Sequence, residues 1–459
     1  MGQPQNGRDR DAWRARRASA GPSVDAAFAF VIFATSLFMV PLGSVGAAIF
    51  VIAPGAYALL RWRQLVLRAG PALLVLLVPL LAVASVLWSE APRETLKYSL
   101  ELVITAAVGV MLVAAKDRSG VLKALYLAYA VYLLASLAWG QTVRVGAFGA
   151  TAFSGLSASK NMFADITATG AIVSVGLLFW ALVARRPAWA LAAVVLLALE
   201  AYLLLAARSA GGLIAVLASV GALTLLTLLR GAGGVGRGLV LAFVGLCVLP
   251  LALAYRSVSA AMIEAAAQMF DKDPTLTGRT YLWYRAQDVI EQRPLLGHGY
   301  AAFWRQGNLD AEGLWRYAGI GSRGGYNFHN TFVDLQVELG WLGLAAFLVV
   351  AAVALTRLAV RFVTRPSQIL CFWIAVLVYQ LVRTPIETVG LAPFYFTAIL
   401  LYAGLAAGLV GDDRDPPQRV PDTPRPPPGS AASEVVDPPH FERVLKGGFS
   451  RSAARRPTR

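Results

Sequence analysis

The sequence predicts an all-α, polytopic membrane protein with about 12 transmembrane helices and one large helical periplasmic loop. Two observations predict this fold class. Of the 459 residues, 57% are hydrophobic and only 15% are charged, whereas about a quarter of the residues of a soluble protein are charged. Apolar residues also form uninterrupted runs of about twenty, the length that crosses a bilayer as a helix. This composition excludes an ordinary soluble enzyme.

Twelve apolar runs bounded by charged residues, Gly or Pro are interpreted as spans, nine before a long polar loop and three after it. They lie near residues 25–42, 44–60, 71–88, 99–115, 121–139, 161–183, 188–206, 210–229, 238–256, 331–355, 368–387 and 391–410. An even number of spans places both ends of the chain on the same side of the membrane.

The distribution of Lys and Arg predicts the orientation, because loops rich in these residues stay in the cytoplasm. Most of the 41 basic residues fall before the first span, in alternate short loops, or after the last span. We therefore place both ends in the cytoplasm and the long loop outside. The net charge of +15 then reflects membrane topology rather than nucleic-acid binding.

This orientation gives a five-part organisation of the chain. Residues 1–24 are predicted to be a basic cytoplasmic segment, 25–256 to hold transmembrane helices 1–9, and 257–330 to form the periplasmic loop. Residues 331–410 are predicted to hold transmembrane helices 10–12. Residues 411–459 are rich in Pro and are expected to form a disordered cytoplasmic tail.

The long loop is predicted to contain two amphipathic helices, at residues 259–270 and 279–292. Thr277 can cap the second helix, whose first turn carries Arg279. Free backbone N–H groups and a guanidinium would then converge on an anion-binding site. An Arg that only ties the loop to the helices is the alternative. The apolar face of the second helix is expected to consist of Leu282, Ala286, Val289 and Ile290.

Ionisable groups inside spans are costly, so each is a candidate functional residue. Two predicted spans carry polar residues every fourth position, which places each set on one inward helix face. Hydrogen bonding between helices is the alternative role for these residues. The pair Arg383 and Glu387, spaced i, i+4, is interpreted as a structural ion pair. The two polar faces consist of Asn161, Asp165 and Thr169, and of Asn330, Asp334 and Glu338.

Of the three histidines, His329 is the functional candidate. It precedes the tenth span at the predicted outer surface, beside Asn330, where an imidazole can act as a base or a hydrogen-bond partner. His298 lies in a turn rich in Gly and Pro and is interpreted as structural, and His440 lies in the predicted tail.

No metal or cofactor site is predicted. Asp271 and Asp273 have the spacing of a metal-binding D-x-D motif, but two acids this close occur often by chance. The sequence has no zinc-ligand spacing, no phosphate or dinucleotide loop in a strand-turn-helix setting, and no nucleophile elbow.

Three stretches resemble the O-antigen ligase and Wzy-type polysaccharide polymerase superfamily, and within it the exopolysaccharide production polymerases. They are DPTLTGRTYLW (273–283), RPLLGHGYAAFW (293–304) and HNTFVDLQVELGWLG (329–343). SASKNMFAD (157–165) and AARSAGGLIA (206–215) fit the same pattern. The resemblance covers the chain from about the sixth span to the tenth.

The resemblance implies a bacterial inner-membrane enzyme that transfers glycans at the periplasmic face. The donor would be an oligosaccharide linked to undecaprenyl diphosphate, and the acceptor would be a glycan or a glycolipid. The surrounding membrane lipid would be a further partner. No metal, cofactor or nucleic acid would be required, and other components of polysaccharide export are candidate partners. Polymerisation of repeat units and ligation to an acceptor such as lipid A core both remain open.

The resemblance also implies the site residues. Arg208 and Arg279 would stabilise the charge on the leaving diphosphate, because fixed guanidinium groups do so without a metal. His329 would lie on the acceptor side, as a general base or as an orienting group. Lys160 would add a phosphate contact. The substrate-binding set predicted for this site is Lys160, Asn330, Asp165 and Arg383.

Two different classes of protein are alternatives. A glycolipid flippase or transporter would need a substrate path open to each side in turn, whereas the ionisable groups of the predicted spans lie in the outer half. A non-catalytic subunit of an export complex would tolerate replacement of Arg279 and His329. An enzyme would not.

Overall fold

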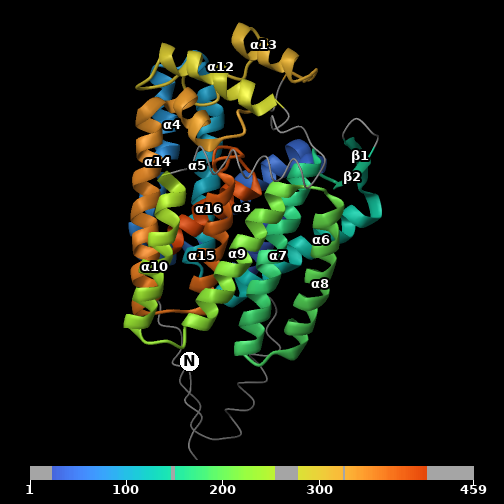
Figure 1. The fold of residues 1–459 in the computed structure, drawn as a ribbon, viewed down its shortest axis with the longest axis vertical. Helices are drawn as coiled ribbons and strands as arrows, with labels where there is room; N and C mark the ends of the chain where they lie inside the picture. The colour runs from blue at the N-terminus through green and yellow to red at the C-terminus, as the bar shows by residue number, and fades with distance from the viewer. Residues whose placement is uncertain (1–22, 146–149, 254–277, 324–325, 411–459) are drawn as a thin grey trace, which may run out of the picture. The chain divides into compact units, whose positions relative to one another are not determined.

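The computed structural model describes residues 23–145, 150–253, 278–323 and 326–410. Most of the regular structure in these ranges is helical, and Figure 1 gives the labels used below. Several predicted features lie outside the described residues: the basic segment before residue 23, the loop helix at 259–270, the tail from residue 411, and the individual residues Asp271, Asp273, Thr277 and His440.

The helices before the long loop are α2 (Val24–Leu37), α3 (Met39–Ala69), α4 (Leu77–Ala84), α5 (Pro92–Ala114), α6 (Arg118–Trp139), α7 (Lys160–Val183), α8 (Pro187–Ala206), α9 (Ala210–Leu229) and α10 (Gly234–Leu253). Two 3-10 helices, η1 (Gly70–Leu76) and η2 (Ser85–Leu87), flank α4. The later helices are α12 (Arg279–Gln292), α13 (Leu309–Tyr317), α14 (Thr331–Thr364), α15 (Gln368–Arg383) and α16 (Phe396–Ala407).

The helices confirm a polytopic membrane protein. Within the described ranges, seven helical segments are long and apolar enough to cross a membrane, and four shorter apolar helices accompany them. One of the seven, Met39–Leu87, has 49 residues and covers two of the predicted spans. The figure of 12 spans, the side on which the loop lies and the five-part division of the chain stay predictions.

Helix α14 is interrupted near its start, and the interruption holds the long loop in place. Gly340 has φ 66°, which breaks the regular helix. The chain after α12 runs alongside this break: His298 N–H donates to the Val337 carbonyl at 2.9 Å, and Trp341 N–H donates to the Pro294 carbonyl at 2.8 Å. A Cβ at position 340 would overlap the carbonyl group of Leu295, so only Gly fits. The RPLLGHG stretch is thereby fixed to α14.

Helices α12 and α13 form a small layer with its own apolar core at one end of the helix bundle (Figure 1). The predicted apolar face of α12 is confirmed, because all four of its residues are buried. They pack with Leu314 and Trp315 of α13 and with Phe303 and Phe328 from the connecting segments. We call this end of the molecule, where α7, α9 and α14 begin and α8 and α15 end, the α12 end.

A two-stranded antiparallel hairpin follows α6, and the all-helical prediction missed it. Its strands are β1 (Gln141–Val145) and β2 (Ala150–Gly155). The stretch is short, and Thr142, Val143, Val145 and Thr151 favour extended backbone within its strands. Of the connections between spans, only the one at 257–330 was interpreted as structured.

Candidate active site

Glu387 is the centre of a cluster of charged side chains at the α12 end. It lies in the turn after α15, four residues beyond Arg383. Its Oε1 accepts a hydrogen bond from Arg279 Nη2 at 2.8 Å, and its Oε2 lies 3.0 Å from His329 Nδ1. Arg383 Nη2 lies 3.5 Å from Oε1. Three segments far apart in the sequence therefore meet at one carboxylate.

Arg279 is aimed at this carboxylate by the backbone before it. It is the first residue of α12, and Gly278 precedes it with φ 90°. A Cβ on Gly278 would lie 3.1 Å from Tyr317 Cε1, so a larger residue would be both strained and crowded. Arg279 Nη1 donates to the Ile386 carbonyl. A guanidinium has five N–H donors, so these two bonds leave further donors for a ligand.

His329 is held in an uncommon backbone conformation, with φ 52°. Its N–H donates to Asn327 Oδ1 at 2.8 Å. The next residue, Asn330, caps α14: its Oδ1 accepts from Phe332 N–H at 3.0 Å and from Val333 N–H at 3.3 Å. The Asn330 side chain therefore fixes the start of the helix that follows His329, and its oxygen is already engaged.

The contacts of His329 determine which ring nitrogen carries the proton. Nδ1 lies 3.0 Å from Glu387 Oε2 and 3.5 Å from Arg279 Nη2. Nδ1 cannot donate to Glu387 and accept from Arg279 at the same time. The contact with the Glu387 carboxylate is the shorter one, so we assign Nδ1 as its donor. Nδ1 is therefore the protonated nitrogen of the neutral ring. Nε2 keeps its lone pair and has no hydrogen-bond partner among the described residues.

The neighbouring arginines and the hydrogen bond from His329 keep Glu387 ionised. Burial alone would raise the pKa of this carboxyl group, but the charge of Arg279, the His329 hydrogen bond and the charge of Arg383 more than offset burial and hold the pKa well below its usual range. Glu387 is thus an anion at neutral pH and can only accept hydrogen bonds. This agrees with a proton on His329 Nδ1.

A second pair of charged groups lies behind Glu387. Arg383 Nη2 lies 2.9 Å from Asp165 Oδ1 and 3.0 Å from Oδ2, and Tyr379 donates to Oδ1 at 2.7 Å. The Arg383 side chain is only 4% exposed. This pair lies behind Glu387 and helps to fix its position. The predicted contacts of Asp165 and Arg383 with substrate stay predictions.

Arg208 lies in the turn between α8 and α9, and Lys160 is the first residue of α7. Arg208 is exposed and has φ 50°, and its carbonyl accepts from Lys160 Nζ at 3.2 Å. Gly211 places the turn against the cluster, because a Cβ there would overlap Arg383 Nη1 and lie 3.1 Å from Ile386 Cδ1. All of the predicted site residues are thus found at the α12 end.

Comparison with known proteins adds two findings. A family model described as O-Antigen ligase matches residues 193–348. The exopolysaccharide production protein ExoQ of Rhizobium meliloti (strain 1021) is 27% identical over 347 residues, which cover 75% of this chain and 78% of that protein. The resemblance to the O-antigen ligase and Wzy superfamily is confirmed. The segment that matches the O-antigen ligase model contains Arg208, Arg279 and His329, whereas Lys160, Asp165, Arg383 and Glu387 lie outside it.

Glu387 is the site residue that sequence reasoning missed. Its spacing from Arg383 indicated an ion pair on one helix, and that contact exists at 3.5 Å. The closer contacts of Glu387 are to Arg279 and His329. One signal was available: the superfamily motifs supply a cation and an imidazole at the predicted outer surface, and an acid near the end of a span is their natural counter-ion.

A second histidine forms a similar pair nearby. His298 Nδ1 lies 2.9 Å from Glu90 Oε1, and its Nε2 lies 3.0 Å from the Val289 carbonyl. Arg293 and Arg305 lie 3.4 Å and 3.5 Å from the same carboxylate. Burial would raise the pKa of Glu90, but His298 and the two arginines lower it. Both ring nitrogens are engaged, which agrees with the predicted structural role of His298.

No metal centre accompanies these residues in the part of the chain that the structure describes. No group of three or more His, Cys, Asp or Glu side chains there could hold a metal ion.

Proposed function

We propose that the protein is an integral membrane glycosyltransferase. It polymerises oligosaccharide repeat units, linked to undecaprenyl diphosphate, at the periplasmic face of the bacterial inner membrane. One observation carries the proposal: His329 offers an unengaged Nε2 beside Arg279, with Glu387 holding both. The match to an O-Antigen ligase model and the similarity to an exopolysaccharide production protein support the same class of reaction.

The proposed reaction is a displacement at the anomeric carbon of the donor glycan. His329 Nε2 takes the proton of an acceptor hydroxyl as its oxygen attacks that carbon. The bond between the carbon and the diphosphate oxygen breaks, and undecaprenyl diphosphate leaves with the electron pair. The remaining donors of Arg279, with Arg208 in the α8–α9 turn and Lys160 at the start of α7, stabilise the negative charge that develops.

Glu387 has two roles in this scheme. It keeps the proton on Nδ1 of His329, so that Nε2 is the basic nitrogen, and it stabilises the imidazolium that forms when Nε2 takes the proton. It also holds Arg279 by a charge-assisted hydrogen bond. Because the arginine and the histidine share one anchor, the diphosphate and the acceptor hydroxyl are positioned relative to each other.

Ligation is the second candidate, since the matching family model is described as O-Antigen ligase. The bond changes would be the same, and only the acceptor would differ. Deletion of the gene distinguishes the two. Accumulation of single lipid-linked repeat units would indicate a lost polymerase, and accumulation of full-length lipid-linked chains a lost ligase.

Replacement of Arg279 tests the proposal. We expect Arg279→Ala to abolish chain extension in a deletion strain, and Arg279→Lys to recover part of it, because Lys keeps the charge but loses the two-pronged geometry. The measurement is polymer length on gels, with protein level measured in the same membranes. The control is Arg293→Ala, which removes another arginine that contacts a glutamate. Normal polymer from Arg279→Ala would exclude the catalytic role.

A further inference from the structure

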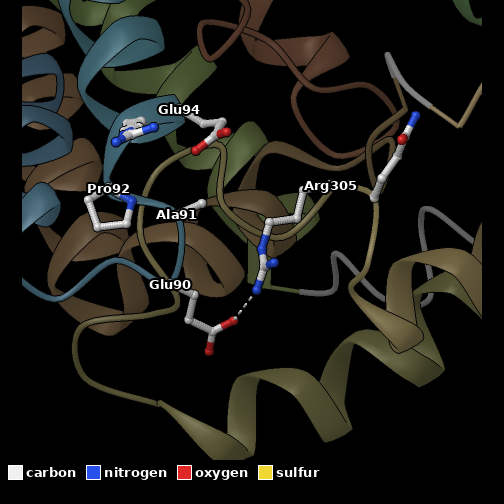
Figure 2. Close-up of a pocket in the computed structure, with 7 residues that line it drawn as sticks. Glu90, Ala91, Pro92, Glu94 and Arg305 are labelled. Atoms are coloured by element: carbon white, nitrogen blue, oxygen red, sulfur yellow. Dashed lines mark hydrogen bonds and ion pairs between the residues drawn. The ribbon is translucent and has the colours of Figure 1, made fainter.

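A pocket of about 550 Å³ lies apart from the Glu387 cluster, lined by residues 90–94 and by Arg305 and Gln306. Figure 2 shows the Arg305 side chain reaching toward Glu90, and the two side chains approach to 3.5 Å. Glu90 begins the turn into α5, whose first residues form one wall. The backbone of this region is fixed, because Glu90 N–H donates to the His298 carbonyl at 3.1 Å and Thr95 Oγ1 donates to the Tyr300 carbonyl at 2.7 Å.

The lining is about half polar, and its charged groups are balanced. It contains two acids, Glu90 and Glu94, and two cations, Arg93 and Arg305. Three of the lining residues are exposed, and their side chains make no hydrogen bond to any described residue: Arg93, Glu94 and Gln306. An anionic ligand would face both carboxylates. Hydroxyl groups both donate and accept, so they can use guanidinium, carboxylate and amide groups together. The lining therefore suits a neutral polyhydroxyl ligand.

A row of aromatic rings leads from Trp304, the neighbour in sequence of the pocket residue Arg305, to His329. The Trp304 ring centroid lies 5.2 Å from that of Tyr326, and the Tyr326 ring lies 5.4 Å from the His329 ring. The indole N–H of Trp304 is buried and has no acceptor among the described residues. The Trp304 ring is anchored in the apolar core of the α12–α13 layer, and both Trp304 and Tyr326 are only partly buried. Partly exposed aromatic faces are typical of small-molecule sites.

We propose that this pocket binds a neutral sugar residue of the glycan substrate, some units away from the bond that is made at His329. This proposal rests on the proposed function. The glycan would extend from His329 past Tyr326 and Trp304 to the pocket. An enzyme with such a remote subsite binds a growing chain more tightly than a single repeat unit, and therefore favours long products.

Neutralising two unengaged side chains tests the subsite. We expect the double variant Arg93→Gln with Glu94→Gln to weaken binding of oligosaccharides of two or more repeat units at least tenfold. The probe is the set of fragments made by partial hydrolysis of the host polysaccharide, and binding to the purified full-length protein is followed by tryptophan fluorescence. The polymer made in a deletion strain should also shorten. The control is Arg285→Gln with Asp288→Asn, an exposed pair on α12.

The outcomes separate this inference from the proposed function. Unchanged fragment binding and unchanged polymer length in the double variant would overturn the subsite. Displacement of the fragments by inorganic phosphate would also overturn it, because the ligand would then be an anion. The proposed function fails by a different result, namely normal transfer by Arg279→Ala. Fragment binding that survives in His329→Ala, while transfer is lost, supports both.

Discussion

The α12 end contains two pairs of a histidine and a glutamate. In both pairs the histidine Nδ1 lies about equally close to a carboxylate oxygen. His329 Nδ1 lies 3.0 Å from Glu387, and His298 Nδ1 lies 2.9 Å from Glu90. Each carboxylate also contacts two arginines. The second ring nitrogen differs. In His298 it bonds to the Val289 carbonyl, and in His329 it has no partner among the described residues.

This difference shows that a paired histidine is not by itself evidence of catalysis. His298 is 5% exposed and both of its ring nitrogens face acceptors, so it has no basic nitrogen to offer a substrate. The His329 side chain is 24% exposed and keeps one nitrogen unengaged. Exposure and the contact of the second nitrogen therefore separate a reactive histidine from a structural one.

Replacing each histidine with Ala gives the largest expected contrast. His329→Ala should lower the transfer rate by about 10² to 10⁴, the usual contribution of one general base, and should leave the protein folded. His298→Ala removes a buried hydrogen bond to the Val289 carbonyl and a part-buried one to Glu90. A buried partner left unsatisfied costs about 1–3 kcal/mol of folding stability. The measurements are transfer rate per folded protein and thermal unfolding in detergent. Equal losses of rate in both variants would remove the distinction.

Replacing each glutamate with Gln should have the next largest effect. In Glu387→Gln the new amide could donate an N–H to His329 Nδ1, which would move the ring proton to Nε2 and remove the base. We expect this variant to lower kcat by about 10², by analogy with the acid of a catalytic triad, where the same kind of change costs more. Glu90→Gln is the matched control: it should change stability and, because Glu90 lines the proposed subsite, fragment binding, but not kcat. A normal kcat for Glu387→Gln would show that Glu387 does not set the tautomer.

The positions of the helices could largely be predicted from the sequence, because a bilayer requires long apolar runs and each helix satisfies its own backbone hydrogen bonds. Helix α12 was also predicted, since its apolar face repeats at helical spacing. The hairpin at Gln141–Gly155 and helix α13 were not. Both are short, and their stability comes from contacts with neighbouring segments rather than from a local pattern.

The site was predicted in part. The superfamily motifs pointed to Arg279 and His329, and the structure brings these side chains together. The sequence could not show that Glu387 joins them, because this depends on the turn after α15 folding back toward α12. It also could not show that the Asn330 oxygen is used as a helix cap, or that Asp165 and Arg383 bond to each other. Their predicted substrate contacts stay predictions.

A small change behind Glu387 gives the finest test of the contrast between the two pairs. Gly211 and Gly221 both lie on α9, but a Cβ at 211 would overlap Arg383 Nη1, whereas a Cβ at 221 meets nothing within 4 Å. Overfilling a packed site costs about 1–3 kcal/mol, and a loss of about 1.4 kcal/mol of transition-state stabilisation is about tenfold in rate. We therefore expect Gly211→Ala to displace Arg383 and lower kcat about tenfold.

Gly221→Ala should leave kcat unchanged and can raise helix stability by up to about 1 kcal/mol, because Ala favours a helix more than Gly does. Neither variant touches the His298 pair, so fragment binding at the Glu90 pocket should stay at the wild-type level in both. A normal kcat for Gly211→Ala would mean that Arg383 can move without disturbing Glu387. The catalytic geometry would then depend on Arg279 and His329 alone, and the pair behind Glu387 would serve only to join α7 with α15.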